Sequence, residues 1–155
     1  MNRDLTGAEI DDVLQSQIYG HLACTLPDHR IYVVPITFAY HHEAIYCFSF
    51  HGLKIDTLRK SPFACFQTEQ FLHENIWRSV ICWGTYEEIS HAEQLSAAKI
   101  IFKRLEREQG MALSPLYQPP ARALLPPVEM AMKEKEAIFY RIRIEQKTGK
   151  HVQYD

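Results

Sequence analysis

The chain has 155 residues, of which 46% are hydrophobic and 23% are charged. These values are typical of a globular protein, and we expect a single domain that spans residues 1–155. The formal net charge is −2 at pH 7, so the sequence lacks the basic excess of a protein that binds nucleic acid nonspecifically. No run approaches the roughly 18 apolar residues of a membrane helix, and the polar first twelve residues do not indicate a signal peptide. We therefore expect that the protein binds neither nucleic acid nor a membrane.

The cysteines lie singly in four apolar runs, at Cys24, Cys47, Cys65 and Cys82. A zinc site needs closely spaced pairs of ligands, and no such pair of cysteines occurs. Isolated cysteines in apolar runs are typical of buried free thiols in a reducing compartment. This pattern predicts a cytoplasmic protein without disulfides.

The first helix is predicted over residues 7–17. Thr6 and Glu9 form a capping-box pair, and Ile10, Val13 and Leu14 follow with helical spacing. "YGHLACTL" is then typical of a strand, and "PDHR" of a turn.

The next strand is predicted over residues 31–40, "IYVVPITFAY". Both of its faces are apolar, which predicts that the strand is covered on both sides, as in a closed barrel whose outside packs against helices or another subunit. Pro35 cannot donate a hydrogen bond to a neighbouring strand, so it indicates an edge or a bulge. Its backbone is then free to meet something other than a strand.

A hairpin at "HHE" leads into a returning strand over 44–50, and "GLKIDTLRKS" follows as a short helix that ends before Pro62. His41, His42 and Glu43 have no third metal ligand nearby, so a solvent-exposed turn is the simpler interpretation. Residues 63–70 are strand-like. Four strands with short links before residue 70 predict an antiparallel meander that closes into a barrel.

The remaining elements begin with a loop at "FLHEN" and a long strand over 77–90, with Gly84 as a bend. "SHAE" predicts a second capping box at Ser90, before a helix to about residue 108 with an apolar stripe and Gly110 as its cap. The members of the stripe are Leu95, Ala98, Phe102 and Leu105. The proline-rich segment 114–127 is predicted to be an extended connection, and residues 138–145 alternate as in a half-buried strand.

Lys54 stands at the start of the short helix, where the helix dipole disfavours a cation. The free N–H groups of a helix start bind phosphate well, Gly52 lets the backbone turn sharply, and a lysine adds compensating charge. Spacing alone leaves open whether Lys54 is a solvated lysine or part of a phosphate site. His51 adjoins this turn, and Arg59 could join Lys54 or pair with Asp56.

No nucleophile–base arrangement stands out in the sequence. Trp77 opens a strand together with Ser79, and it is either a core residue or a wall of a flat aromatic site.

Four segments, in their order and spacing, resemble the pyridoxamine 5'-phosphate oxidase-related flavoproteins, and most closely the branch that includes the nitroimidazole-resistance proteins. The resemblance covers roughly residues 17–110, and its segments are VVP, IYCFS, GLKIDTLRKSPFACF and WRSV. It implies a fold that is mainly β with flanking helices: an antiparallel, Greek-key-like split β-barrel. It also implies a homodimer with FMN at the subunit interface.

The resemblance implies the roles of individual residues. Lys54 would hold the FMN phosphate, and Ser49 with its neighbours Phe48 and Phe50 would contact the ribityl or phosphate end. Gln67 would lie near the ring, and Trp77 and Ser79 would complete the pocket, from either subunit. His51 or Arg59 would supply a second phosphate donor. The backbone that would line the isoalloxazine ring comes from Val33, Val34, Pro35, Ile36 and Thr37.

The implied function is an FMN-dependent oxidoreductase that passes electrons from a reduced nicotinamide to a small planar acceptor such as a nitroaromatic. The chain departs from true pyridoxamine phosphate oxidases because its end, "HVQYD", lacks their arginine-containing substrate motif. Two alternatives are a haem-binding or haem-degrading protein, with His51, His73 or His91 as axial ligand, and a flavin carrier or sensor without turnover.

Overall fold

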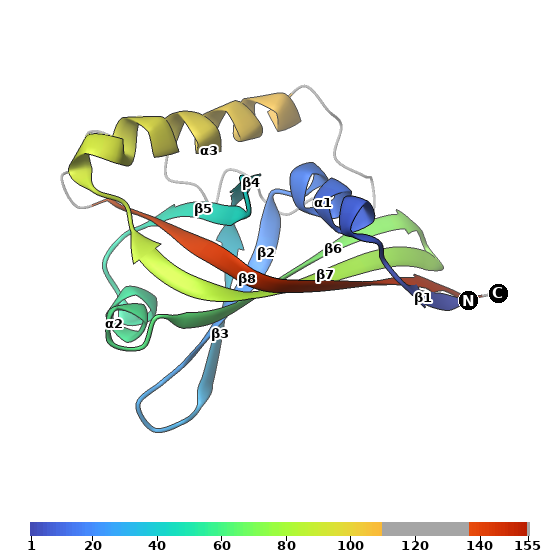
Figure 1. Ribbon diagram of the computed structural model, residues 1–155, viewed down its shortest axis with the longest axis horizontal. Helices are drawn as coiled ribbons and strands as arrows, with labels where there is room; N and C mark the ends of the chain where they lie inside the picture. Colours follow the sequence, from blue (N-terminus) through green and yellow to red (C-terminus); the bar gives the residue numbers. More distant parts are fainter. Residues whose placement is uncertain (110–136, 155) are drawn as a thin grey trace.

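The computed structural model describes residues 1–109 and 137–154. Its centre is an antiparallel sheet of eight strands in the order β3-β2-β6-β7-β8-β5-β4, with β1 paired to β8. Figure 1 shows this sheet curving around an interior, with α3 lying across one side. The fold is thus an antiparallel half-barrel flanked by helices, which confirms the predicted split β-barrel. The strands are β1 (Asn2–Asp4), β2 (Tyr19–Thr25), β3 (Ile31–Thr37), β4 (Ala39–His41), β5 (Ala44–Ser49), β6 (Phe63–His73), β7 (Ile76–Glu88) and β8 (Ile138–Gln153).

Three α-helices accompany the sheet in the described part of the chain, and the 3-10 turn η1 (His91–Glu93) precedes the last of them. The helices are α1 (Gly7–Ser16), α2 (Leu53–Lys60) and α3 (Gln94–Gln109). The Thr6–Glu9 capping box predicted for α1 is confirmed: the Glu9 N–H donates to the Thr6 hydroxyl, and the Thr6 N–H donates to the Glu9 carboxylate. No described helix combines the length and the hydropathy that crossing a membrane would require.

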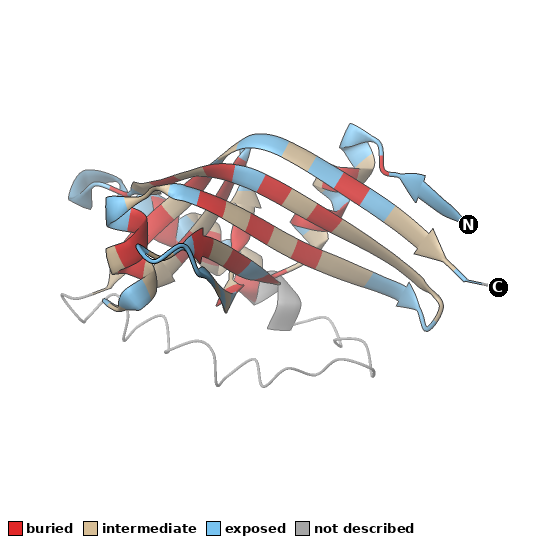
Figure 2. Cartoon of the chain, turned by 90° about the horizontal axis from the view of Figure 1, so that it is seen from below, coloured by how far each residue is buried: buried red, intermediate tan, exposed pale blue. Residues whose placement is uncertain are grey.

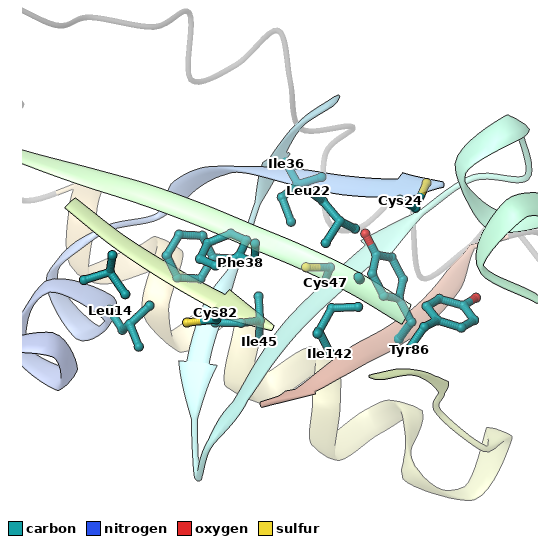
Figure 3. Packing of buried hydrophobic residues seen from close by; sticks show 14 of the residues in the cluster. Leu14, Leu22, Cys24, Ile36, Phe38, Ile45, Cys47, Cys82, Tyr86 and Ile142 are labelled. Carbon is teal, nitrogen blue, oxygen red and sulfur yellow. The ribbon is translucent and has the colours of Figure 1, made fainter. Parts of the chain in front are cut away.

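The main core fills the inner side of the sheet, between the strands and the helices α1 and α2. It contains Leu14 from α1, Leu58 from α2 and alternate residues of the strands. Cys24, Cys47 and Cys82 are buried within it, where they pack among aliphatic and aromatic side chains (Figure 3). The four cysteines are free thiols, as predicted, although Cys65 is only half-buried.

A second, smaller core lies beneath α3. The buried residues of α3 are Ala97, Ala98, Ile101 and Leu105, and they pack with Phe139 and Ile89. The buried face of α3 is therefore turned about the helix axis from the predicted stripe: Leu95, a predicted member, is 56% exposed, whereas Ile101, which was not predicted, is buried. The predicted capping box at Ser90 was also wrong: Ser90 Oγ bonds the Glu93 carboxylate directly and caps no backbone N–H group. Gly110 and the proline-rich segment lie outside the described residues.

The predicted strand 31–40 is broken at Phe38 into β3 and β4. The N–H group of Phe38 donates to the carbonyl of Ile18, and its fully buried ring packs against Phe66 with centroids 4.6 Å apart. Burial of this ring in the main core turns the chain away from β2. β3 is consequently an edge strand, which confirms the placement of Pro35 at an edge.

The first four strands do not form the predicted meander. β2–β3 and β4–β5 are separate hairpins at the two ends of the strand order, and they are joined through β6, β7 and β8. The turn between β4 and β5 is confirmed, with positive φ at His42 and Glu43. The segment predicted as a loop at 71–75 is mostly strand, because β6 continues through a bulge to His73.

Gly84, where the sequence predicts a bend, lies at an irregularity of the β7–β8 pairing. Trp83 pairs with Gln146 and Gly84 with Ile144, so the extra residue of this bulge is on β8. A Cβ atom at position 84 would lie 2.2 Å from the carbonyl oxygen of Arg143, which leaves room only for glycine.

No described helix or strand of the chain covers the outer side of the sheet over β3 and the β6–β7 hairpin. Figure 2 shows buried and exposed residues alternating along the strands, as expected when only one face of a sheet is covered. The expectation that β3 is covered on both faces is not met within a single chain: Ile31 is 66% exposed and Val33 is 55% exposed.

Candidate functional site

Lys54 projects from the first turn of α2 toward the inner side of the half-barrel. Its ammonium lies 5.7 Å from the centre of the buried Tyr140 ring. No carboxylate in the described part of the chain lies within ion-pair distance of it. Burial lowers the pKa of the Lys54 ammonium, and the nearby Cys47 and Cys24 thiols act in the opposite direction. A half-buried cation without a counter-charge is costly, and an anion beside it would remove that cost.

The start of α2 adds backbone donors next to this ammonium. The helix forms because Ile55 and Leu58 are buried against the core. Gly52 is its N-cap and provides no side-chain acceptor for the first N–H groups. The φ angle of Gly52 is 169°, which is ordinary extended backbone. The prediction that Gly52 provides a sharp turn was therefore wrong. A Cβ atom there would meet nothing within 4 Å, so the approach to the helix start is open.

The two proposed second donors are held by carboxylates. His51 Nε2 lies 2.9 Å from Asp56 Oδ1. Arg59 bonds Glu88 rather than joining Lys54 or Asp56. Of the three basic residues near this turn, Lys54 is therefore the one available to an anion.

Among the described strands, β3 pairs with β2 alone, so its other backbone edge carries no strand from residues 1–109 or 137–154. Val34 and Ile36 face the main core, whereas Val33 and Pro35 face the open outer side. The Thr37 hydroxyl is buried, and no hydrogen-bond partner for it lies among the described residues. The predicted flavin-lining segment can thus offer backbone groups and one hydroxyl to a ligand.

The end of β5 leads directly into the Lys54 turn. Ser49 and Phe50 are half-buried, and Ser49 Oγ donates to the Phe50 carbonyl over 3.0 Å. Phe48 lies elsewhere: its ring packs on Phe139 at 5.8 Å in the core beneath α3. Phe48 and Cys47 lie on opposite faces of β5. Of the three predicted contacts, Phe48 is therefore the one that points away from Lys54.

The remaining predicted residues line one groove of about 290 Å³ on the outer face of the β6–β7 hairpin. The groove is lined by Gln67, Glu69, Phe71, Glu74, Trp77 and Ser79. Phe71 pairs with Trp77 across the two strands, and Glu69 pairs with Ser79. Sequence reasoning named Gln67, Trp77 and Ser79. It missed Phe71 and Glu74 because residues 71–75 were interpreted as a loop, and it did not single out Glu69 although that residue lies in the strand predicted over 63–70. Period-two alternation continued through Phe71 would have placed Glu69 and Phe71 on the face of Gln67.

One chain therefore divides the predicted residues between two places. Lys54 faces the main core side of the sheet, whereas the groove lies on its outer face. α2 and the tip of the β6–β7 hairpin also lie at opposite ends of the molecule (Figure 1). A ligand that touches both groups would have to lie between two chains.

In the part of the chain that the structure describes, the histidines proposed as haem ligands and the possible metal ligands form no second centre. His51, His73 and His91 are all exposed, so none of these three faces a closed pocket. Among the described residues, no three histidine, cysteine or acidic side chains are grouped as metal ligands.

The family model described as pyridoxamine 5'-phosphate oxidase matches residues 6–151. The chain belongs to the pyridoxamine 5'-phosphate oxidase family. An uncharacterized protein from Rhizobium meliloti is 31% identical over 121 residues, which cover 75% of this chain and 80% of that protein.

Solved structures share the fold of this chain. A FAD-binding protein from Mesorhizobium loti is 27% identical, with a TM-score of 0.74 over 99% of each chain. A candidate 5-nitroimidazole antibiotic resistance protein from Bacteroides thetaiotaomicron is 20% identical, with a TM-score of 0.71 over 100% of this chain and 91% of that chain. The second likeness concerns the fold alone. The split barrel of this pyridoxamine 5'-phosphate oxidase family member is thus shared with a protein described as flavin-binding.

Proposed function

We propose that this protein is a flavin-dependent oxidoreductase whose cofactor is FMN. The observation that carries the proposal is Lys54, a half-buried ammonium without a carboxylate partner in the described chain, at an open helix start. This arrangement suits a phosphate group, which a helix start and a lysine bind together. The relative from Mesorhizobium loti that is described as FAD-binding supports a flavin as the phosphate-bearing ligand.

The phosphate would be held by Lys54 and the first N–H groups of α2. Ser49 and Phe50 would lie at the ribityl side, and the free edge of β3 would offer backbone groups and the Thr37 hydroxyl to the ring. A bound flavin supplies hydride and single-electron chemistry, so the chain itself needs only to bind, orient and shield it. In the proposed reaction, a reduced nicotinamide is the donor and a small planar ring, such as a nitroaromatic, is the acceptor.

The proposal includes a homodimer with the cofactor between the chains. The exposed apolar residues of the outer face, which include Ile31, Val33, Phe63, Phe71 and Trp83, would be covered by a second copy. The same arrangement would bring the groove of one chain toward the Lys54 turn of its partner. We place the protein in the cytoplasm on the basis of its free thiols.

The first test is the absorption spectrum of the purified protein, before and after addition of FMN or FAD. We expect flavin absorption bands, and oxidation of NADH or NADPH when a nitroaromatic acceptor is present. If the protein binds flavin but shows no turnover with any pair of donor and acceptor, the function would instead be that of a flavin carrier or sensor. Failure to bind either flavin, together with a haem band on titration, would replace the proposal with the haem-binding alternative.

A further inference from the structure

Tyr140 is a fully buried tyrosine of β8 whose ring lies under the Lys54 ammonium. The distance of 5.7 Å between this ammonium and the centre of the ring is within the range of a cation–π interaction. The ring of Tyr86 packs on Tyr140 with centroids 5.3 Å apart, and Cys47 is the partner of Tyr140 across β5 and β8. The core therefore holds this aromatic surface in one place.

The groups beside the Lys54 ammonium are uncharged at neutral pH. Its electrostatic neighbours are the thiols of Cys47 and Cys24. Burial raises the pKa of the Cys47 thiol to about 12 and raises the pKa of the Cys24 thiol above its ordinary value. Burial also raises the pKa of the Tyr140 phenol. These neighbours therefore leave the positive charge of Lys54 uncancelled.

The acidic residue opposite Tyr140 is bonded elsewhere. Glu88 pairs with Tyr140 across β7 and β8, but its carboxylate accepts hydrogen bonds from Arg59 and from the Tyr86 hydroxyl. A carboxylate bonded to Lys54 would compete with a phosphate for the ammonium. An aromatic ring attracts the same ammonium and leaves its charge available to an anion.

We infer that Tyr140 is a positioning residue, whose ring holds the Lys54 ammonium by a cation–π contact in the place where it meets the phosphate of the cofactor. A lysine side chain is flexible and loses much conformational freedom when its ammonium is fixed. Because the ring already restricts this motion, less freedom is lost when the phosphate binds. That the ligand is a flavin phosphate rests on the proposed function, whereas the contact between the two side chains does not.

The first experiment observes this contact by NMR in the full-length protein without flavin. The ring current of an aromatic side chain shifts the resonances of protons above its face upfield. We expect the ε-methylene protons of Lys54 to resonate upfield of those of the exposed Lys60, with the same shift in Tyr140→Phe. The signal is assigned by its loss in Lys54→Arg. Resonances of Lys54 at the position of Lys60 would overturn the inference.

The second experiment weakens the contact and keeps the shape of the core. Position 140 carries phenylalanine or its monofluorinated, difluorinated or trifluorinated form, which withdraw increasing electron density from the ring face. The quantity measured is the affinity for FMN divided by the affinity for riboflavin, two flavins that differ only in the phosphate group. We expect this ratio to be unchanged in Tyr140→Phe and to fall stepwise with fluorination, by about threefold or more in the trifluorinated protein. A ratio that stays constant or rises with fluorination would overturn the inference.

Phe139 provides the matched control, because it is the neighbour of Tyr140 in β8 but packs on Phe48 in the core beneath α3. The same fluorinated residues at position 139 should leave the ratio unchanged. An equal fall at both positions would indicate a general effect on the fold and would contradict the assignment. If the protein binds neither flavin, the proposed function fails, while the resonances of Lys54 still decide whether Tyr140 holds its ammonium.

Discussion

At the scale of single residues, Lys54 combines burial, isolation and backbone donors. Its ammonium rests over the buried Tyr140 ring, and the described carboxylates near the turn are bonded to His51 and Arg59 instead. An anion that enters here meets one available positive charge and a helix start. Among the side chains, Lys54 should therefore make the largest contribution to the free energy of binding an anion here.

Lys54→Ala should weaken FMN binding, by about 1.5–3 kcal/mol, since it removes one charge-assisted contact. The measurement is flavin titration followed by absorbance or fluorescence. Lys60→Ala, which removes an exposed lysine from the last turn of the same helix, is the control and should leave affinity unchanged. Equal affinities of the two variants would place the phosphate elsewhere.

At the scale of secondary-structure elements, local patterns predicted what local interactions determine. Thr6 and Glu9 cap α1 through hydrogen bonds between neighbours in sequence, and the spacing of Ile10, Val13 and Leu14 marks the buried face of the same helix. The break at Phe38 could not be predicted in the same way. It depends on a hydrogen bond to Ile18 and on packing against Phe66, which only the folded chain brings together.

Gly84→Ala should destabilise the fold by roughly 1–3 kcal/mol, because the new methyl group would overlap the Arg143 carbonyl. Chemical denaturation should show a lower midpoint with an unchanged slope. Gly7→Ala is a useful comparison, since a Cβ atom there meets nothing within 4 Å, and it should cause no such loss.

The β7–β8 pairing is also sensitive to acid through Glu87. Hydrogen bonds from Arg141, and then from Arg143, lower the pKa of Glu87 from 4.5 to about 2. Ionised Glu87 thus stabilises the fold above pH 4.5, and this contribution is lost as the pH falls toward 2. The carboxylate is partly exposed, so we expect at most about 1 kcal/mol at neutral pH.

Glu87→Gln should therefore be less stable than the wild type at pH 7, and the difference should shrink between pH 4.5 and 2. Thermal denaturation across this range provides the measurement. Glu74→Gln, at an exposed glutamate without an ion pair in the described structure, should show no such trend. A difference that stays constant with pH would contradict the role of Glu87.

At the scale of the whole molecule, the main unexplained feature is the outer face of the sheet, where a single chain leaves large apolar side chains exposed to solvent. The two-sided apolar pattern of β3 was visible in the sequence, and Ile31 and Val33 are the exposed half of it. The groove was only partly predictable, because which residues of β6 and β7 meet depends on their register. A second copy over this face would explain both the exposed side chains and the division of the site.

Val33→Asp should convert the proposed dimer into monomers, since it places a charge on the exposed apolar side of the edge strand β3. Size-exclusion chromatography with light scattering measures the mass, and absorbance measures the loss of flavin that should accompany it. Leu95→Asp, at an exposed leucine on α3, is the control and should leave both unchanged. A wild type that is monomeric yet retains flavin would contradict the interface site.

The most direct test of the central claim compares the affinities of the wild-type protein for FMN and for riboflavin, which differ only in the phosphate group. If Lys54 and the start of α2 hold that phosphate, FMN should bind more tightly by a factor of about ten or more. Equal binding of the two flavins, or binding of neither, would contradict a phosphate site at Lys54.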